Sequence, residues 1–184
     1  MDETDVDSYF YHNIFDISQS QHRIVRVSKG STKKSFAIKL FQFCGLETEQ
    51  RYILQEEVNI SKRELTYLVD SLRDFLETFD QASNCIQIPR PKPKIEIGST
   101  KSKDNLFAHH YNDIIEHPNR QIRLSFRFGN NNSCVFSLKK FELHGNQFIL
   151  TEIVNLNHRE IYHLYKNRYY VANKCEIIES NYNV

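Results

Sequence analysis

Lysines and arginines gather in two stretches of this chain that contain no acidic residue. Residues 17–46 hold six of them and residues 117–141 hold five, although the net charge of the chain is only +1. Clustered cations bind nucleic-acid phosphates, and single-strand binders add aromatic rings on which bases stack, each stack contributing about 1–3 kcal/mol. Phenylalanines occur among these cations. The pattern predicts a site for single-stranded nucleic acid.

The candidate binding residues combine these cations with neighbouring phenylalanines. Strand alternation puts Ile38 and Leu40 on one face and Lys39, Phe41 and Phe43 on the other, so the second face mixes charge with aromatic rings. Two other interpretations stay open. A phenylalanine in a strand is usually part of the core, and a single lysine or arginine is usually a solvated surface residue. The predicted nucleic-acid-binding residues are Arg26, Lys29, Lys33, Lys34, Lys39, Phe41, Arg123, Arg127, Phe128, Lys139, Lys140 and Phe141.

Patterns of catalysis or metal binding do not occur in the sequence. His109, His110 and His117 lie close together, but no carboxylate or cysteine stands near them at metal-ligand spacing. The chain has no P-loop, no G-x-S-x-G and no G-x-G-x-x-G. We therefore expect no enzyme, no cofactor and no metal.

The first residues, the apolar runs and the cysteines indicate the cellular compartment of the protein. The start, MDETDVDSYF, is acidic and has no apolar core of a signal peptide, and no apolar run approaches the length of a membrane span. The four cysteines lie far apart, which is typical of reduced thiols. We expect an intracellular protein without a membrane segment, located in the nucleus, or in a host nucleus if its source is viral.

The elements that position the candidate residues are written twice in the chain. Residues 52–68, YILQEEVNISKRELTYL, and residues 148–164, FILTEIVNLNHREIYHL, are identical at eight of seventeen positions. The similarity extends back to SFAIKLFQF at 35–43 and VFSLKKFEL at 135–143. Such an internal repeat predicts two copies of one structural unit.

Within each unit the apolar period changes from two to 3.6, which predicts strands followed by a helix. Both helix starts carry a capping box, with Ser61 and Glu64 in the first unit and Asn157 and Glu160 in the second. A small sheet with one helix is marginal by itself, so two such units are expected to pair about an approximate two-fold axis.

The predicted fold is α+β, with two tandem repeats of a β-sheet and a C-terminal helix that form an intramolecular pseudo-dimer with exposed, curved antiparallel sheets. The expected divisions are an acidic N-terminal tail (1–10), a first β-β-β(-β)-α repeat (11–84), a basic Pro-rich linker (85–108), a second β-β-β(-β)-α repeat (109–178) and a C-terminal tail (179–184).

The order RIVRVS, a turn, AIKLFQF and then VNISKRELTYLVDSL resembles the repeat of the positive-cofactor-four transcriptional coactivators. SLKKFELHGN and VNLNHREIYHL resemble the same second strand and helix start in the other half. Plant whirly proteins and Pur proteins share a related strand-then-helix order. The resemblance implies a fold whose exposed β surface binds single-stranded nucleic acid.

The family's binding positions fall on residues of both halves. The resemblance matches Lys39 and Lys139 to the arginine of the family's second strand, and Phe41 and Phe141 to its aromatic residue. Arg127 with Phe128 resembles the basic-then-aromatic pair of the first hairpin. The chain departs from the family before each helix, where QEE and TEI replace a basic Lys-Gly segment.

Two functions of different class follow from these patterns. The first is binding of single-stranded DNA, or RNA, in transcription or replication, with transcription or replication proteins as further partners. The second is a non-enzymatic protein-interaction module of the same fold that has lost nucleic-acid binding. The acid-free basic stretches favour the first, and the near-zero net charge favours the second. The expected assembly is a monomeric pseudo-dimer or a further homodimer.

Overall fold

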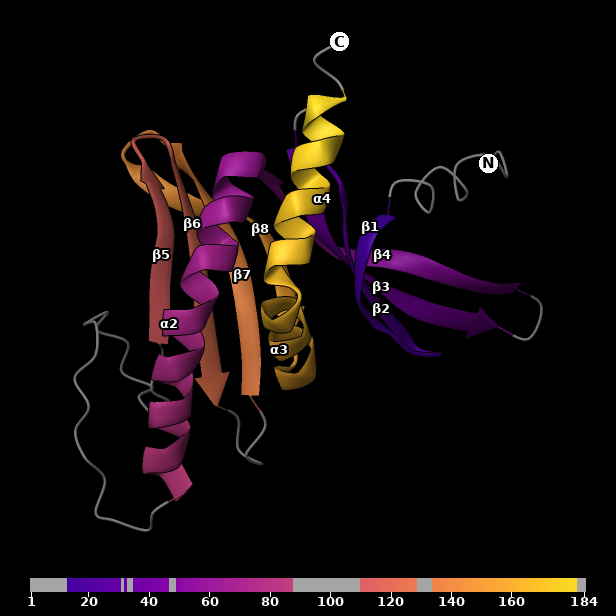
Figure 1. Ribbon diagram of the computed structural model, residues 1–184, viewed down its shortest axis with the longest axis horizontal. Helices are drawn as coiled ribbons and strands as arrows, with labels where there is room; N and C mark the ends of the chain where they lie inside the picture. Colours follow the sequence, from indigo (N-terminus) through magenta and orange to yellow (C-terminus); the bar gives the residue numbers. More distant parts are fainter. Residues whose placement is uncertain are drawn as a thin grey trace.

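The computed structural model describes residues 13–30, 32, 35–46, 49–87, 110–128 and 134–181. These residues form an α+β fold in which eight antiparallel strands make one curled sheet and three helices cover one of its faces (Figure 1). None of the helices formed by the described residues is long and apolar enough to cross a membrane.

The elements occur in the same order in each half of the chain. The first half consists of β1 (Asn13–Gln19), β2 (Arg23–Lys29), β3 (Ser35–Leu46), β4 (Glu49–Ser61) and α2 (Lys62–Gln87). The second half consists of β5 (His110–His117), β6 (Arg120–Phe128), β7 (Cys134–His144), β8 (Gln147–Leu156), α3 (His158–Lys166) and α4 (Arg168–Ser180). The strand order across the sheet is β1-β2-β3-β4-β8-β7-β6-β5, so β4 and β8 meet at its centre.

The core lies between the sheet and the helices, and each helix covers strands of the other half. Phe75 of α2 packs edge-on against Phe126 of β6 and Phe136 of β7, with ring centroids 5.5 and 6.1 Å apart. In the other direction, Phe15 of β1 stacks on His163 of α3 with ring centroids 5.4 Å apart. Neither half therefore buries its helix stripe without the other half.

Both predicted capping boxes are confirmed. The Ser61 hydroxyl accepts the Glu64 N–H (3.2 Å) while the Glu64 carboxylate accepts the Ser61 N–H (2.8 Å). Asn157 and Glu160 make the same pair of bonds at 2.9 and 2.8 Å. Each pair satisfies two N–H groups that a helix start leaves without a partner inside the helix. The local sequence thus fixes where both helices begin.

The second half's helix is interrupted at Asn167, which separates α3 from α4. Arg168, at the position of Leu72 in the first half, does not enter the core. Its guanidinium lies over the rings of Tyr165 and Tyr169, 4.1 and 4.4 Å from the ring centroids, and donates to the Tyr165 carbonyl. These contacts hold the side chain at the surface beside the break.

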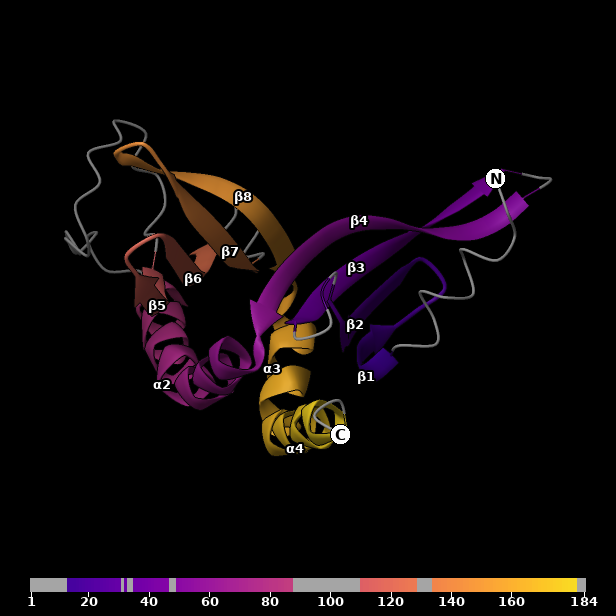
Figure 2. The ribbon, with the colours of Figure 1, turned by 90° about the horizontal axis from the view of Figure 1, so that it is seen from above.

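The third predicted strand of each unit runs without a break into the fourth segment, as β4 and β8. Matching register shifts occur between Leu40 and Phe41 and between Lys140 and Phe141. Beyond these bulges the β3–β4 and β7–β8 hairpins extend in opposite directions from the centre of the sheet (Figure 2). Gly145, with φ 62°, occupies the tight turn of the second hairpin, where a left-handed conformation favours glycine.

The predicted unit boundaries differ slightly from the observed ends of the helices. α2 continues to Gln87 and α4 to Ser180, which is three and two residues past the expected ends at 84 and 178. The N-terminal tail, nearly all of the Pro-rich linker and the last three residues lie outside the described residues.

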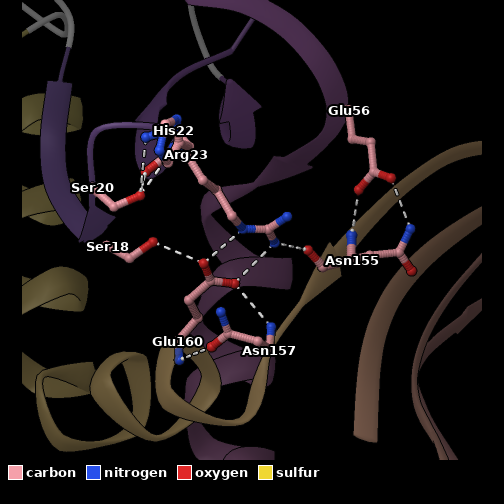
Figure 3. Close-up of polar contacts among 8 residues, drawn as sticks. All are labelled: Ser18, Ser20, His22, Arg23, Glu56, Asn155, Asn157 and Glu160. Carbon is pink, nitrogen blue, oxygen red and sulfur yellow. Dashed lines mark hydrogen bonds and ion pairs between the residues drawn. The ribbon is translucent and has the colours of Figure 1, made fainter. Parts of the chain in front are cut away.

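Reciprocal polar contacts join the halves where β4 meets β8. The Glu56 carboxylate accepts hydrogen bonds from the main-chain N–H of Asn155 (2.6 Å) and from its side-chain amide (2.8 Å) (Figure 3). In the opposite direction, Glu152 accepts the main-chain N–H of Asn59 at 2.6 Å. Because β4 and β8 pair directly only at Glu57 and Ile153, these carboxylates extend the joint beyond the strand ladder.

An ion pair on each side links a strand of one half to the helix start of the other. Arg23 donates to both oxygens of Glu160, at 2.8 and 3.0 Å, and to the Asn155 carbonyl at 2.6 Å (Figure 3). Arg120 donates to Glu64 in the matching position. Burial raises the pKa of Glu160, but hydrogen bonds from Arg23, Asn157 and Ser18 outweigh this effect and hold the pKa below its usual range.

Candidate nucleic-acid interface

Four predicted cations lie in one line across the sheet. Directly paired residues of neighbouring antiparallel strands point to the same face, so the strand register defines a transverse row. The row reads Asp16, Arg26, Lys39, Glu57, Ile153, Lys139, Arg123 and Asp113, from β1 to β5. We call its members Arg26, Lys39, Lys139 and Arg123 the cation row.

The cation row lies on the face of the sheet that is opposite to the helices. Lys39 stands between Ile38 and Leu40, which belong to the core, so alternation turns its side chain to the outer face. Lys139 has the same relation to Leu138. The predicted separation of Lys39 from the apolar face is therefore confirmed for β3, and β7 has the same arrangement at Lys139.

Apolar and aromatic pairs continue the same face along each hairpin. In the first half, Phe41 pairs with Leu54 and Phe43 with Tyr52, whose rings meet edge to face with centroids 5.5 Å apart. The Tyr52 hydroxyl also donates to main-chain carbonyls of the β1–β2 turn. The first hairpin thus carries a platform of rings beside Lys39.

The second hairpin carries the matching platform. Phe141 pairs with Leu150 and Leu143 with Phe148, and the Arg123 guanidinium lies 5.4 Å from the centroid of the Phe141 ring. Leu150 and Phe148 are 44% and 38% exposed. Cations and exposed apolar side chains are therefore adjacent here, as stacked bases between phosphates require.

Tyr52, Leu54, Phe148 and Leu150 were not among the predicted residues, although they complete both platforms. The available signal was the pairing of β4 with β3, which carries Phe41, and of β8 with β7, which carries Phe141. That signal depends on the bulge, which shifts the register by one residue and cannot be placed from alternation alone.

The two halves differ in how much of this face is open to solvent. Arg26, Lys39 and Phe41 are only 8%, 7% and 5% exposed, whereas Arg123 and Lys139 are half-buried. The expectation that both sheets expose the candidate residues is therefore wrong for these three residues of the first half, while Arg123 and Lys139 of the second half are partly exposed. Alternation fixes the face of a side chain but not what packs over that face.

Two predicted cations point to the helix side of the sheet instead. Lys140 shares the face of Leu138 and is buried, with its amine 3.1 Å from Glu152 and 3.7 Å from Glu142. Lys29 shares the face of Val27, and burial lowers the pKa of its amine. These two predicted binding residues therefore do not lie on the face of the cation row, because each is offset from it by an odd number of positions along its strand.

The remaining predicted residues divide between the outer face and the parts that lie outside the description. Arg127 is exposed and has the same parity along β6 as Arg123, so it extends the cationic face. Lys33 and Lys34 lie outside the described residues, as does the side chain of Phe128.

Arg123 and Arg127 lie close to Lys139, so three cations form one group. Burial, followed by the neighbouring charges of Arg123 and Arg127, lowers the pKa of the Lys139 amine. A cluster of like charges that repel one another on an open face is stabilised by a bound anion. This part of the outer face therefore has the electrostatics of a phosphate site.

Binding of a phosphate at Lys139 is expected to weaken at alkaline pH. The lowered pKa means that the amine of the unbound protein loses its proton earlier than an ordinary lysine, while a phosphate favours the charged form. Affinity for a single-stranded oligonucleotide should fall as the pH rises from 7 to 10, and Lys139→Arg should reduce this fall by up to about tenfold because a guanidinium stays charged. Anisotropy titrations across this pH range test it, and superimposable profiles contradict it.

The described residues contain no group of three His, Cys, Asp or Glu side chains placed to hold a metal ion. Burial raises the pKa of the Cys134 thiol to about 11 and that of Cys175 to about 12, so both stay protonated at neutral pH. A protonated thiol is a poor nucleophile.

Comparison with known proteins finds no family model and no curated protein that match this chain. A solved structure of trypanosome MRP1/MRP2 is similar to it with a TM-score of 0.35 and 10% sequence identity, over 87% of this chain and 79% of that chain. A TM-score of this size supports no conclusion about function, which has to be inferred from the residues themselves.

Proposed function

We propose that this chain binds single-stranded nucleic acid, in particular DNA, on the outer face of its sheet and acts in transcription or replication. We also propose that its halves are tandem copies of one sheet-plus-helix unit, docked as an intramolecular pseudo-dimer related to the positive-cofactor-four coactivators. The observation that carries the binding proposal is the cation row with an apolar platform on each hairpin.

The pseudo-dimer is supported by the contacts between the halves. The central pair of the sheet joins Glu57 to Ile153, and these residues occupy the same position of the two repeated segments. The residues paired outward from this point match in type, with Lys39 and Arg26 on one side and Lys139 and Arg123 on the other. A two-fold interface has this property, since each contact occurs twice with the partners exchanged.

The dimensions of the row suit an extended strand of nucleic acid. Arg26 and Arg123 stand on strands five spacings apart, which is about 24 Å at about 4.8 Å per spacing. Site sizes of about 4–16 nucleotides are usual for single-strand-binding β folds. A strand of several nucleotides can therefore span the row. Its phosphates can reach the partly exposed Arg123 and Lys139 directly, whereas Arg26 and Lys39 are buried.

Single strands are favoured over duplexes because the platforms need exposed base faces. A duplex keeps its bases stacked on one another and presents only phosphates and groove edges to a sheet. Phe148 and Leu150 contribute to binding only when an unstacked base lies on them. The platforms therefore select for single strands, while the cation row alone does not.

The experiment that tests the proposal is an anisotropy titration of single-stranded DNA, single-stranded RNA and duplex DNA of equal length at several salt concentrations. We expect tighter binding of the single strands and a log–log salt slope of about −2 to −3, which corresponds to three or four phosphate contacts at about 0.7 each. Absence of binding to every oligonucleotide at low salt contradicts the proposal.

A protein-interaction module is the second candidate function, and exposed apolar side chains favour it. Tyr169, Tyr170 and Ile177 of α4 are all more than one-third exposed, on the side of the molecule away from the cation row. An apolar interface with a protein partner depends little on salt. The same salt series therefore separates the two functions.

A further inference from the structure

The edge of β8 carries a run of exposed apolar residues between the hairpin turn and the contact with β4. β4 and β8 pair only at Glu57 and Ile153, and the two strands diverge from there toward their hairpin turns (Figure 2). Phe148, Ile149 and Leu150 are 38%, 49% and 44% exposed. Among the described residues, no strand pairs with these three on the side opposite to β7. Their main chain therefore lies along an open edge of the sheet.

The exposed run has apolar side chains on both faces of the hairpin. Phe148 and Leu150 belong to the outer face, where they form the platform of the second hairpin. Ile149 pairs with Glu142 and points to the helix side, yet about half of its side chain stays exposed, so no helix covers it. A strand that pairs with this edge would cover apolar side chains on both faces at once.

The equivalent stretch of β4, residues 51–55, is less suited to pairing with another chain. Arg51 stands there at the repeat position of Gln147. Tyr52 is half-buried, and its hydroxyl donates to carbonyls of the β1–β2 turn. Charged side chains on an edge strand oppose pairing with a further strand. Residues 147–151 of β8 contain no charge and no proline, so this protection is missing in the second half.

The exposed run is complementary to itself in one antiparallel register. Residues directly opposite each other in an antiparallel pair lie on the same face of the sheet. With Ile149 opposite Ile149 of a second copy, Phe148 stands opposite Leu150, so every side chain meets an apolar one. A shift by one residue sets inner against outer side chains, and a shift by two sets Gln147 against Ile149. The register with Ile149 on a two-fold axis is therefore favoured.

The joint between the halves is a precedent for such a contact. Glu57 and Ile153 occupy the same position of the two repeats and pair antiparallel, so equivalent strands already meet edge to edge within one chain. A second copy can pair with β8 closer to the hairpin turn without displacing β4. The turn at Gly145 ends the hairpin of that copy before it reaches Ile153, where β4 occupies the edge.

We propose that two copies of this chain associate through the open edge of β8, by antiparallel pairing of residues 148–150 with the same residues of the second copy. The β7–β8 hairpins of both copies then form one four-stranded antiparallel sheet. Because the pairing occupies the same apolar edge on both copies, the assembly closes at two chains. An interface of this size is typical of a weak, reversible dimer.

The dimer also extends the proposed nucleic-acid site, and this consequence rests on the proposed function. Edge pairing uses main-chain groups, so Phe148 and Leu150 stay on the outer face of the joined sheet. The platforms of the two second halves become one surface, flanked on each side by the cation group of Arg123, Arg127 and Lys139. A strand that crosses both copies contacts two such groups, which raises its affinity through effective concentration.

Sedimentation equilibrium without nucleic acid tests the association. We expect the mean mass of the parent to rise from one chain toward two between about 1 and 100 μM protein, as for a small interface. Ile149→Lys places two like charges at the two-fold axis and should weaken association at least about tenfold. Ile53 has the same repeat position in the first half and is 37% exposed, so the control Ile53→Lys should associate like the parent.

Cross-linking tests the register of the pairing. In a background in which the exposed Cys44 is replaced (Cys44→Ser), a short thiol-specific cross-linker should join two copies of Ile149→Cys at least about tenfold faster than two copies of Ile53→Cys. Cys44→Ser alone gives the background from the other thiols. Positions 53 and 149 are both exposed, and circular dichroism verifies that each variant is folded.

Oligonucleotides of about 10 and about 25 nucleotides give a second readout, because only the longer one exceeds the usual site of a single fold. We expect the longer strand to bind the parent and Ile53→Lys at least about tenfold more tightly than the shorter one, and this gain to fall below about threefold in Ile149→Lys. Both variants carry the same added charge, and Ile149 is not on the face that contacts bases.

A parent that stays at one chain up to about 100 μM overturns the inference, and so does a dimer that Ile149→Lys leaves intact, even if nucleic acid binds. Equal cross-linking of the two cysteine variants also overturns it and assigns the edge of β8 to another occupant. If the dimer forms in the expected register but no oligonucleotide binds, the edge contact stands and the proposed function fails.

Discussion

Reversing two charges of the open half, in the variant Arg123→Glu/Lys139→Glu, is expected to lower the affinity for a single-stranded oligonucleotide by at least about 100-fold at low salt. Each residue can form a charge-assisted hydrogen bond with a phosphate, and each such bond contributes about 1.5–3 kcal/mol. Two lost bonds amount to about 3–6 kcal/mol, and 1.4 kcal/mol corresponds to tenfold in affinity. Both side chains are half-buried on an outer face, so the fold should tolerate the change.

The matched control for this variant is Arg159→Glu/Lys166→Glu. Both residues are exposed on α3, on the helix side of the molecule, and the pair carries the same change of net charge. We expect the control to bind within about threefold of the parent, because only long-range attraction is altered. Anisotropy at 50 and 200 mM salt, with thermal unfolding of each protein, measures both effects. Equal affinities of the two variants contradict the assigned face.

Removing the Arg23–Glu160 ion pair, one of the two described between the halves, is expected to have the largest effect on stability. Arg23→Ala leaves the Glu160 carboxylate, only 2% exposed, without its main cationic partner. Breaking a buried pair in this way costs about 3–5 kcal/mol, and we expect the lower end because Arg23 is partly exposed. The remaining bonds from Ser18 and Asn157 soften the loss. Urea unfolding at pH 7 measures the change.

The effect of Arg23→Ala should depend on pH in a defined direction. The pKa of Glu160 is lowered in the folded protein, so its ionisation adds stability above the pKa of an unfolded carboxyl group. This stability is lost as the pH falls through the lowered folded value. The difference between parent and variant should therefore be largest near neutral pH and shrink in acid.

Arg73→Ala is the control for the ion-pair variant. Arg73 pairs with Glu77 one turn along α2, and both side chains are exposed. Such a solvent-exposed pair contributes little to stability, so this variant should unfold almost like the parent. If Arg23→Ala is no more destabilising than Arg73→Ala, the pair is not a main connection between the halves.

The helix starts could be predicted because they depend on residues only three positions apart. A capping box needs Ser61 and Glu64, or Asn157 and Glu160, and no other part of the chain. Strand alternation is equally local, which is why Lys39 was assigned to the face opposite Ile38 and Leu40. The same rule, applied to Lys140 and Lys29, would have turned them to the helix side.

The candidate interface depends on contacts that are distant in sequence. The pairing of Glu57 with Ile153 aligns the two pairs of cations in one row, and a shift of one residue there would move one pair out of line. The bulge before Phe141 decides that Leu150 lies beside it. Neither feature follows from the order of residues within one strand.

By itself, the sequence determined the strand and helix order, both helix starts and the face on which Lys39 lies. These features follow from hydrophobic periods and helix caps of a few residues. Tertiary structure alone decided that α2 packs on the second half, that the cations form one row and that Lys39 is buried while Lys139 is open. The reason is that register, docking and burial depend on which distant segments meet, and the free energy of that meeting is spread over many side chains.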